Sequence, residues 1–282
     1  VVCSPVSTIA EIINKISKLI KKDCIITDVG SIKYNIYKSL SRISAEKYIG
    51  SHPMTGSEKS NIENSDSSIF ENAVVIITNN KETNKNNITE LIKFWELLKC
   101  KIQVIDIKIH DLIVAYISHL PHLTASALVK TSGISFFKKN KLNILPFAGG
   151  GFKDSTRIAA GNPDLWTDIF FNNSNYVLNA IDCFLENVND FKKSLLSNDK
   201  KKIRAYLSSS AKTRESLQAQ VKRILKFIYE IVIHVEDKPG MIGKIAMILG
   251  KNKINIKYIE VLYVRENEPG SIKIGVNSQT DM

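Results

Sequence analysis

The sequence lacks long apolar runs and paired cysteines. No stretch of about 18 apolar residues occurs, and no basic segment precedes an apolar one at the start, so we expect neither a membrane span nor a signal peptide. The cysteines are widely spaced without a CxxC pair, which argues against a disulfide framework or a cysteine-based zinc site. We therefore expect a cytoplasmic protein with reduced thiols. The cysteines are Cys3, Cys24, Cys100 and Cys183.

Arginine is also scarce, since only six of the 39 basic residues are arginine. The formal net charge of +11 could by itself suit a nucleic acid, an anionic membrane or anionic small molecules. Lysine is, however, spread along the whole chain, and no nucleic-acid-binding motif accompanies it. The charge therefore indicates a compositional bias, and we expect neither a nucleic-acid nor a membrane partner.

Apolar segments in the first third predict an α/β fold. Helical periodicity over residues 9–20 and 88–98 alternates with short apolar segments, which predicts a mostly parallel sheet. Ligands of such sheets bind beyond the carboxyl ends of the strands. Asp28–Ser31 and His52–Pro53 follow two of these segments, so we expect them to meet in one crevice. The predicted strands are residues 1–3, 24–27, 48–50, 73–77 and 101–105.

The rest of the chain predicts two further domains. Long helical patterns cover residues 109–129, 162–171, 176–196 and 199–226, and Asn162 followed by Pro163 is a typical helix start. Pro121 is expected to bend the first of these helices. From residue 229 a β-α-β-β order predicts a small α+β module. We thus divide the chain at 1–106, 107–226 and 229–282.

Four of the five histidines lie between residues 52 and 122. Histidine has the side-chain pKa nearest neutrality, so such a cluster suggests proton chemistry or ligation. A zinc site of His52, His119 and His122 lacks a recognisable ligand spacing and a carboxylate partner, so we expect no metal. Each histidine taken alone would more often have a structural role. For His110 we expect only such a role.

Five motifs together resemble the prephenate dehydrogenase family, followed by an amino-acid-sensing ACT domain. The resemblance covers residues 1 to about 225, and its motifs stand in the family's order. It implies oxidative decarboxylation of prephenate to 4-hydroxyphenylpyruvate with NAD, or NADP, in tyrosine biosynthesis. Arogenate dehydrogenase activity is the alternative within the family. The motifs are Asp28–Lys33, Gly50–Ser60, His110–Asp111, Ser118–His122 and Ala148–Ala159 with Pro163 and Trp166.

The resemblance also implies roles for individual residues. His52 would accept the proton of the ring hydroxyl, which suits a neutral imidazole, and Ser31 would hold it by a hydrogen bond. Arg157 would bind the substrate carboxylate, because its planar guanidinium pairs a carboxylate bidentately. Trp166 would close the pocket from the partner subunit of a homodimer. The other expected substrate contacts are Ser118, His119, His122, Gly150 and Glu58.

Cofactor and effector sites are implied less completely. The fingerprint GxGxxG is absent, so we expect the first βαβ half of the dinucleotide-binding domain to be missing from the chain. The turn at 237–243 resembles the effector site of ACT domains, where the start of a helix can bind a carboxylate, and tyrosine is the natural effector. We expect the second helix and the last strand of that domain to be missing from the chain. Expected cofactor contacts are Ser4, Pro5, Asp28, Gly30 and Ser31, and expected effector contacts are Asp237, Pro239, Gly240 and Met241.

Two alternatives remain open at this point. A truncated, non-catalytic chain would keep a helical dimer core and an amino-acid-binding module without turnover. A β-hydroxyacid dehydrogenase would share the architecture, but it would use a catalytic lysine and leave the paired histidine motifs unexplained.

Overall fold

The structure, a computed structural model, describes residues 1–21, 23–56, 63, 65–79, 83–133, 139–141, 143–224, 229–236, 238–262 and 270–276. Two predicted site residues, Glu58 and Asp237, lie outside these ranges. The chain divides into two compact units, Val1–Val188 and Asn189–Met282, and each is described by itself.

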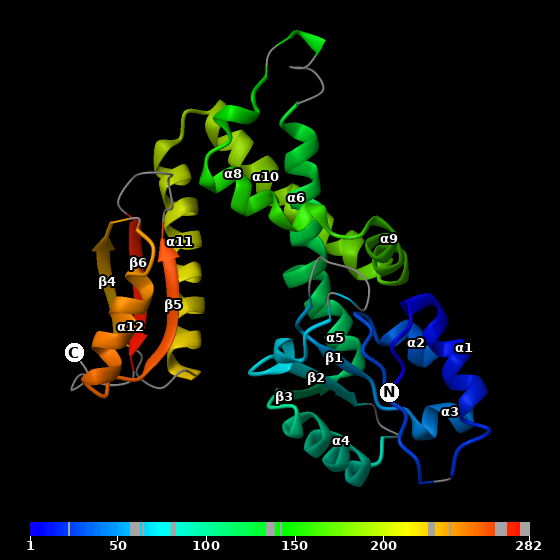
Figure 1. Ribbon diagram of the computed structural model, residues 1–282. Helices are drawn as coiled ribbons and strands as arrows, with labels where there is room; N and C mark the ends of the chain where they lie inside the picture. The colour runs from blue at the N-terminus through cyan, green and yellow to red at the C-terminus, as the bar shows by residue number, and fades with distance from the viewer. Residues whose placement is uncertain are drawn as a thin grey trace. The chain divides into compact units, whose positions relative to one another are not determined.

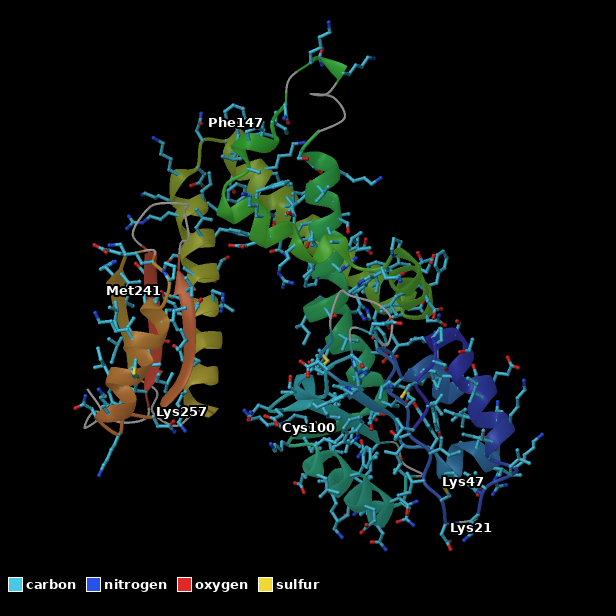
Figure 2. The ribbon with its side chains drawn as sticks, viewed as in Figure 1. Lys21, Lys47, Cys100, Phe147, Met241 and Lys257 are labelled. Carbon is cyan, nitrogen blue, oxygen red and sulfur yellow. The ribbon has the colours of Figure 1, made fainter. Side chains whose placement is uncertain are left out.

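Three short helices flank the beginning of the chain in the first unit (Figure 1). The apolar face predicted for the first helix packs inward, with Ile9 and Ile13 fully buried. Lys47 donates hydrogen bonds to the carbonyls of Ser17, Ile20 and Lys21 just beyond that helix, at 3.3, 3.2 and 3.0 Å (Figure 2). A cation there satisfies carbonyls that the helix leaves unpaired. These helices are α1 (Val6–Ile16), α2 (Tyr34–Lys38) and α3 (Arg42–Lys47).

A three-stranded sheet follows, in the order β1-β2-β3. β2 (Val74–Asn79) and β3 (Lys101–Asp106) are parallel and joined by α4 (Lys85–Leu97), as the alternating pattern predicts. Leu91 and Trp95 of α4 are buried in the core that includes β2. β1 (Ser51–Pro53) adds to the other edge of β2 in the antiparallel direction. A 3-10 turn, η2 (Ser67–Phe70), precedes β2.

Three predicted strands are corrected by the structure. Residues 1–3, 24–27 and 48–50 form only isolated parallel bridges, which pair Val2 with Asp28 and Ile26 with Tyr48. Hydrogen bonds such as Ile49 N–H to Ile26 C=O, at 2.9 Å, give these bridges their direction. The pairing stays short because the apolar segments end after three or four residues and polar side chains with buried partners follow.

A long helix leads out of the sheet and carries the histidine motifs. α5 (Ile107–Val114) begins directly after β3, where the Asp106 carboxylate caps it by accepting the N–H of Lys108 at 2.8 Å. The helix continues through a π-helical segment (Ala115–His119) into α6 (Leu120–Thr131). By length and composition, this is the one helix of the described residues that could cross a membrane. Its buried His110, Asp111 and His119 contact the sheet and later helices instead.

The remaining helices of the first unit begin with α8 (Gly150–Thr156), η5 (Arg157–Ala160) and α9 (Pro163–Asn172). Asn162 caps α9 as predicted, because its Oδ1 accepts the N–H groups of Asp164 and Leu165 at 2.9 and 3.2 Å. Asp168 of α9 accepts the N–H of Ser7 at 3.0 Å, which ties α9 to the first turn of α1. η4 (Leu145–Phe147) precedes α8, and α10 (Ser174–Leu196) runs into the second unit.

The second unit contains α11 (Lys200–Ile224) and an antiparallel sheet of order β4-β6-β5. Ile245 and Leu249 of α12 (Met241–Lys251) pack on the buried face of this sheet, around Ile272 and Ile274. The order β-α-β-β agrees with the sequence-based prediction. The strands are β4 (Tyr229–Val235), β5 (Ile256–Leu262) and β6 (Gly270–Val276).

Candidate active site

His52 lies inside strand β1, where it pairs with Ile76 of β2 and is 7% exposed. The sequence suggested a position after a strand rather than within one. The difference arises because the chain passes tightly at Gly50, where a Cβ would lie 2.6 Å from Thr78 Oγ1 and 2.7 Å from Lys33 Cδ. Only glycine fits there, so the chain continues along β2 and holds His52 against the sheet.

His52 is hydrogen-bonded to His110, for which the sequence predicts only a structural role. Its Nδ1 lies 2.8 Å from Nε2 of His110, and Nδ1 of His110 lies 2.6 Å from Oδ1 of Asp111. Asp111 also accepts the backbone N–H groups of Lys33 at 2.8 Å and Tyr34 at 2.9 Å. A continuous buried hydrogen-bonded chain thus runs from Asp111 through His110 to His52.

Asp28, expected to contact the cofactor, is fully buried in an inner cluster. It accepts a hydrogen bond from Tyr48 Oη at 2.8 Å and from Gly30 N–H at 2.9 Å, and it forms an ion pair with Lys33. The Asp28 carboxylate thus has three donors and no exposed surface, and its expected cofactor contact stays a prediction. Burial lowers the pKa of Lys33, and the Asp28 carboxylate opposes that shift.

The π-helical segment Ala115–His119 places the later histidines on the face of the earlier ones. Three regular helical turns take about 11 residues, so His122 would overshoot the face of His110 by one residue. A π turn contains roughly one more residue than an α-helical turn. The hydrogen bond from Leu120 N–H to Ala115 C=O, five positions earlier, is of this kind. The π segment ends just before Pro121, where the sequence predicts a bend.

His119 and His122 form a second aromatic group with Trp166. The rings of His122 and Trp166 are stacked, with centroids 3.6 Å apart and an interplanar angle of 11°. Asn173 Nδ2 lies 3.1 Å from His119 Nδ1 and also donates to the Asp111 carbonyl at 2.9 Å. His119 Nε2 and His122 Nδ1 are buried and have no hydrogen-bond partner among the described residues. Such atoms are available to a bound ligand.

All the site histidines are held in the neutral form. Burial lowers the pKa of His52 well below its usual value, and the nearby His110, Lys33 and His119 lower it further. Burial lowers the pKa of His119 to about 4, against a smaller opposing effect of Asp111. Burial also lowers the pKa values of His110 and His122. Near pH 7 the site therefore presents imidazoles that can accept protons.

A cavity of about 880 Å³ opens between the beginning of α1 and α9. Its lining includes the predicted cofactor residues Ser4 and Pro5, together with Val29 and Thr167. Ser4 Oγ is buried and has no hydrogen-bond partner among the described residues. The volume lies within the range of about 300–1,000 Å³ usual for small-molecule sites. In the part of the chain that the structure describes, no group of His, Cys, Asp and Glu could hold a metal ion.

Comparisons with known proteins give this arrangement a family. Residues 1–104 match the prephenate dehydrogenase nucleotide-binding domain, residues 106–209 its dimerization domain, and residues 229–270 the ACT domain. The prephenate dehydrogenase of Lactococcus lactis is 30% identical over 99% of this chain and 77% of its own length. The chain belongs to the prephenate dehydrogenase family. The Bacillus subtilis prephenate dehydrogenase is 29% identical over 93% of this chain and 71% of its own.

Solved structures agree with this membership. The Aquifex aeolicus prephenate dehydrogenase in complex with hydroxyphenyl propionate and NAD+ has a TM-score of 0.70 at 33% identity, over 76% of this chain and 74% of that one. The Synechocystis arogenate dehydrogenase has a TM-score of 0.67 at 25% identity, over 76% and 77% of the two chains. The cyclohexadienyl dehydrogenase of Zymomonas mobilis is 30% identical over 77% of this chain and 74% of its own.

The other residues expected from the resemblance to prephenate dehydrogenases differ in their burial and in their contacts. Ser118 is half-buried within the π segment. Arg157 begins η5, which packs on α6, and both Arg157 and Gly150 are exposed. Ser31 is half-buried, and among the described contacts His52 pairs with His110 rather than with Ser31. Trp166, expected from a partner subunit, contacts His122 of its own chain.

Sequence reasoning missed three residues that are hydrogen-bonded to the candidate site histidines. His110 and Asp111 were noted only as a motif, although their position one turn after a strand that ends at Asp106 places them beside the sheet. Asn173 follows α9 without a recognisable motif, so nothing in the sequence pointed to its contacts with His119 and Asp111.

Proposed function

We propose that the chain catalyses the NAD-dependent oxidative decarboxylation of prephenate to 4-hydroxyphenylpyruvate. The observation that carries this proposal is the buried, neutral His52, hydrogen-bonded through Nδ1 to His110, in a chain of the prephenate dehydrogenase family. Oxidation of a ring alcohol requires an acceptor for the hydroxyl proton, and a neutral imidazole can act as that acceptor near pH 7.

His52 would take the hydroxyl proton as the C–O bond becomes a carbonyl. Bound NAD would supply the acceptor for the hydride that leaves the same carbon. Loss of the ring carboxylate as carbon dioxide then leaves a phenolate, to which His52 can return the proton, so protons balance over the cycle. General-base assistance of this kind is worth about 10²–10⁴-fold, and orientation of the substrate supplies much of the rest.

The cavity beside α1 suits the nicotinamide end of the cofactor. Its volume of about 880 Å³ and the unpartnered, buried Ser4 Oγ are features of a small-molecule site with a few polar groups. Ser4 and Pro5 line it, and we assign cofactor contacts to these residues, to Gly30 and to Ser31. NAD is preferred over NADP because the Aquifex aeolicus relative is described with NAD+.

We assign substrate contacts to the second aromatic group and to the helices beside it. His119 Nε2 and His122 Nδ1 are the unpartnered atoms available for polar groups of the substrate. The exposed guanidinium of Arg157 is free to pair with a carboxylate. Ser118, Gly150, Trp166 and Glu58 complete the proposed set. Prephenate is preferred over arogenate because the matched domain models and the two bacterial relatives carry its name.

The assembly and regulation of the protein belong to the same proposal. The dimerization-domain match supports a homodimer, and the ACT match supports an amino-acid effector. A cavity of about 470 Å³ in the second unit is lined by Pro239, Gly240 and Met241, with Met241 at the start of α12 (Figure 2). We propose tyrosine as its ligand, with Asp237 contributing. We keep the domain bounds 1–106, 107–226 and 229–282, and a cytoplasmic location.

The test is formation of NADH, followed by its absorbance, when the purified chain is mixed with prephenate and NAD. Arogenate and NADP are assayed in parallel, and the assay is repeated with any segment that the gene encodes upstream of Val1. We expect prephenate with NAD to give the highest kcat/KM and 4-hydroxyphenylpyruvate as product. Preference for arogenate would contradict the substrate assignment, and absence of turnover in both forms would contradict the function.

A further inference from the structure

We propose that His110 and Asp111 are positioning residues that fix the tautomer of His52 and compensate the charge it gains during turnover. The proposal rests on the proposed function of His52 as proton acceptor. It gives a defined purpose to the buried hydrogen-bonded chain Asp111–His110–His52.

The direction of each hydrogen bond follows from Asp111. Backbone N–H groups only donate, so the bonds from Lys33 at 2.8 Å and Tyr34 at 2.9 Å make both carboxylate oxygens of Asp111 acceptors. His110 Nδ1, 2.6 Å from Oδ1 of this carboxylate, is therefore the donor in that contact. The proton of neutral His110 thus sits on Nδ1, and its Nε2 keeps a lone pair.

The same logic reaches His52. Its Nδ1 lies 2.8 Å from the Nε2 lone pair of His110, so Nδ1 of His52 donates and carries the ring proton. Nε2 of His52 is then the unprotonated nitrogen, which is the form that a proton acceptor needs. The opposite tautomer would place two lone pairs face to face at Nδ1 and would block Nε2 with a proton.

Charge compensation is the second purpose. Once Nε2 of His52 takes the hydroxyl proton, the imidazolium is disfavoured first by its burial and then by the nearby His110 and Lys33. The Asp111 carboxylate is the opposing charge, and His110 connects it to His52 by contacts of 2.6 and 2.8 Å. His119, which also lowers the pKa of His52, has its own pKa lowered to about 4 and is therefore neutral near pH 7.

Nitrogen NMR of the unaltered protein decides the tautomer directly. The protein is labelled with ¹⁵N-histidine, and the His52 signals are assigned by their loss in His52→Asn. We expect a protonated Nδ1 and an unprotonated Nε2 for both His52 and His110 at pH 7. A protonated Nε2 on His52 would overturn the proposal, whether or not the protein turns over prephenate.

Two variants at one position test the kinetic consequence. His110→Gln can still accept the Nδ1 proton of His52 through its amide oxygen, whereas His110→Leu cannot. We expect His110→Leu to lower kcat on the order of 10–10²-fold with little change in the KM for prephenate, and His110→Gln to recover most of it. Equal kcat values for both variants would indicate a packing role and overturn the proposal. An inactive parent protein would refute the proposed function alone, since the tautomer is measured without turnover.

Discussion

His122 lies flat on Trp166 of the same chain, with ring centroids 3.6 Å apart and an interplanar angle of 11°. Gly161 packs against both rings, and a Cβ there would lie 2.6 Å from Trp166 Nε1 and 3.1 Å from His122 Cε1. The stack therefore depends on a glycine at this position. It forms one wall of the proposed substrate pocket within a single chain.

Gly161→Ala should disrupt this wall. The added methyl group must displace the indole, and overpacking of this kind costs about 1–3 kcal/mol of stability. We expect a lower thermal midpoint and a KM for prephenate raised several-fold, measured by thermal denaturation and steady-state kinetics. Gly250→Ala is the matched control, because a Cβ at Gly250 meets nothing within 4 Å. If the two variants behave alike, the stack does not shape the pocket.

The buried histidines make stability depend on pH. The pKa of His119 falls from 6.5 to about 4 on folding, so the unfolded chain binds more protons between these values. Stability is therefore complete above pH 6.5 and declines as the pH falls towards 4. Urea denaturation at several pH values should show this decline in the free energy of unfolding. The variant His119→Asn should make the free energy of unfolding depend less steeply on pH. His234→Asn, at an exposed site of the second unit, is measured alongside as the control. A pH-independent midpoint would contradict the burial of neutral imidazoles.

Arg157→Ala should chiefly weaken binding of prephenate. Loss of a charged hydrogen bond to a carboxylate is worth about 1.5–3 kcal/mol, so we expect a higher KM with kcat little changed. The KM of Arg157→Lys should lie between those of the unaltered protein and Arg157→Ala, because lysine keeps the charge and loses the bidentate geometry. Exposed Arg204 of α11 provides the control, Arg204→Ala. An unaltered KM in Arg157→Ala would remove this residue from the substrate site.

Gly240→Ala should uncouple the effector site from catalysis. Gly240 has a φ of 87° at the start of α12, a left-handed conformation that costs a residue with a Cβ about 1–2 kcal/mol. We expect weaker inhibition by tyrosine, measured as a higher half-inhibitory concentration, with the uninhibited rate retained. The control is again Gly250→Ala. Normal inhibition in Gly240→Ala would argue against this turn as the effector site.

Much of the fold was predictable because its signals are local. The apolar face of α1, the Asn162 cap of α9 and the β-α-β-β order of the last module each depend on neighbouring residues. The position of His52 inside a strand was not predictable, because it depends on how closely the chain passes Thr78 and Lys33 at Gly50. Among the first three helices, only α1 is long enough to show a clear helical period, and it was predicted. The helices α2 and α3 span too few residues for such a period.

The site was predictable in its histidines but not in their connections. The family resemblance identified His52, His119 and His122, and the structure buries all three. The contact between His52 and His110 joins a strand to a helix 58 positions away in the sequence. The π segment before His122 has no propensity signal, and Pro121 predicted only a bend at this point.

The proposed role of His52 as acceptor of the substrate proton is tested by His52→Asn. Asparagine keeps the polar character of the side chain and removes the basic nitrogen. The measurement is kcat for prephenate-dependent NADH formation, compared between His52→Asn and the exposed control His234→Asn. We predict a fall of at least about 10²-fold in His52→Asn with an unchanged thermal midpoint and no fall in the control. A His52→Asn protein that turns over prephenate at a near-normal rate would contradict the claim.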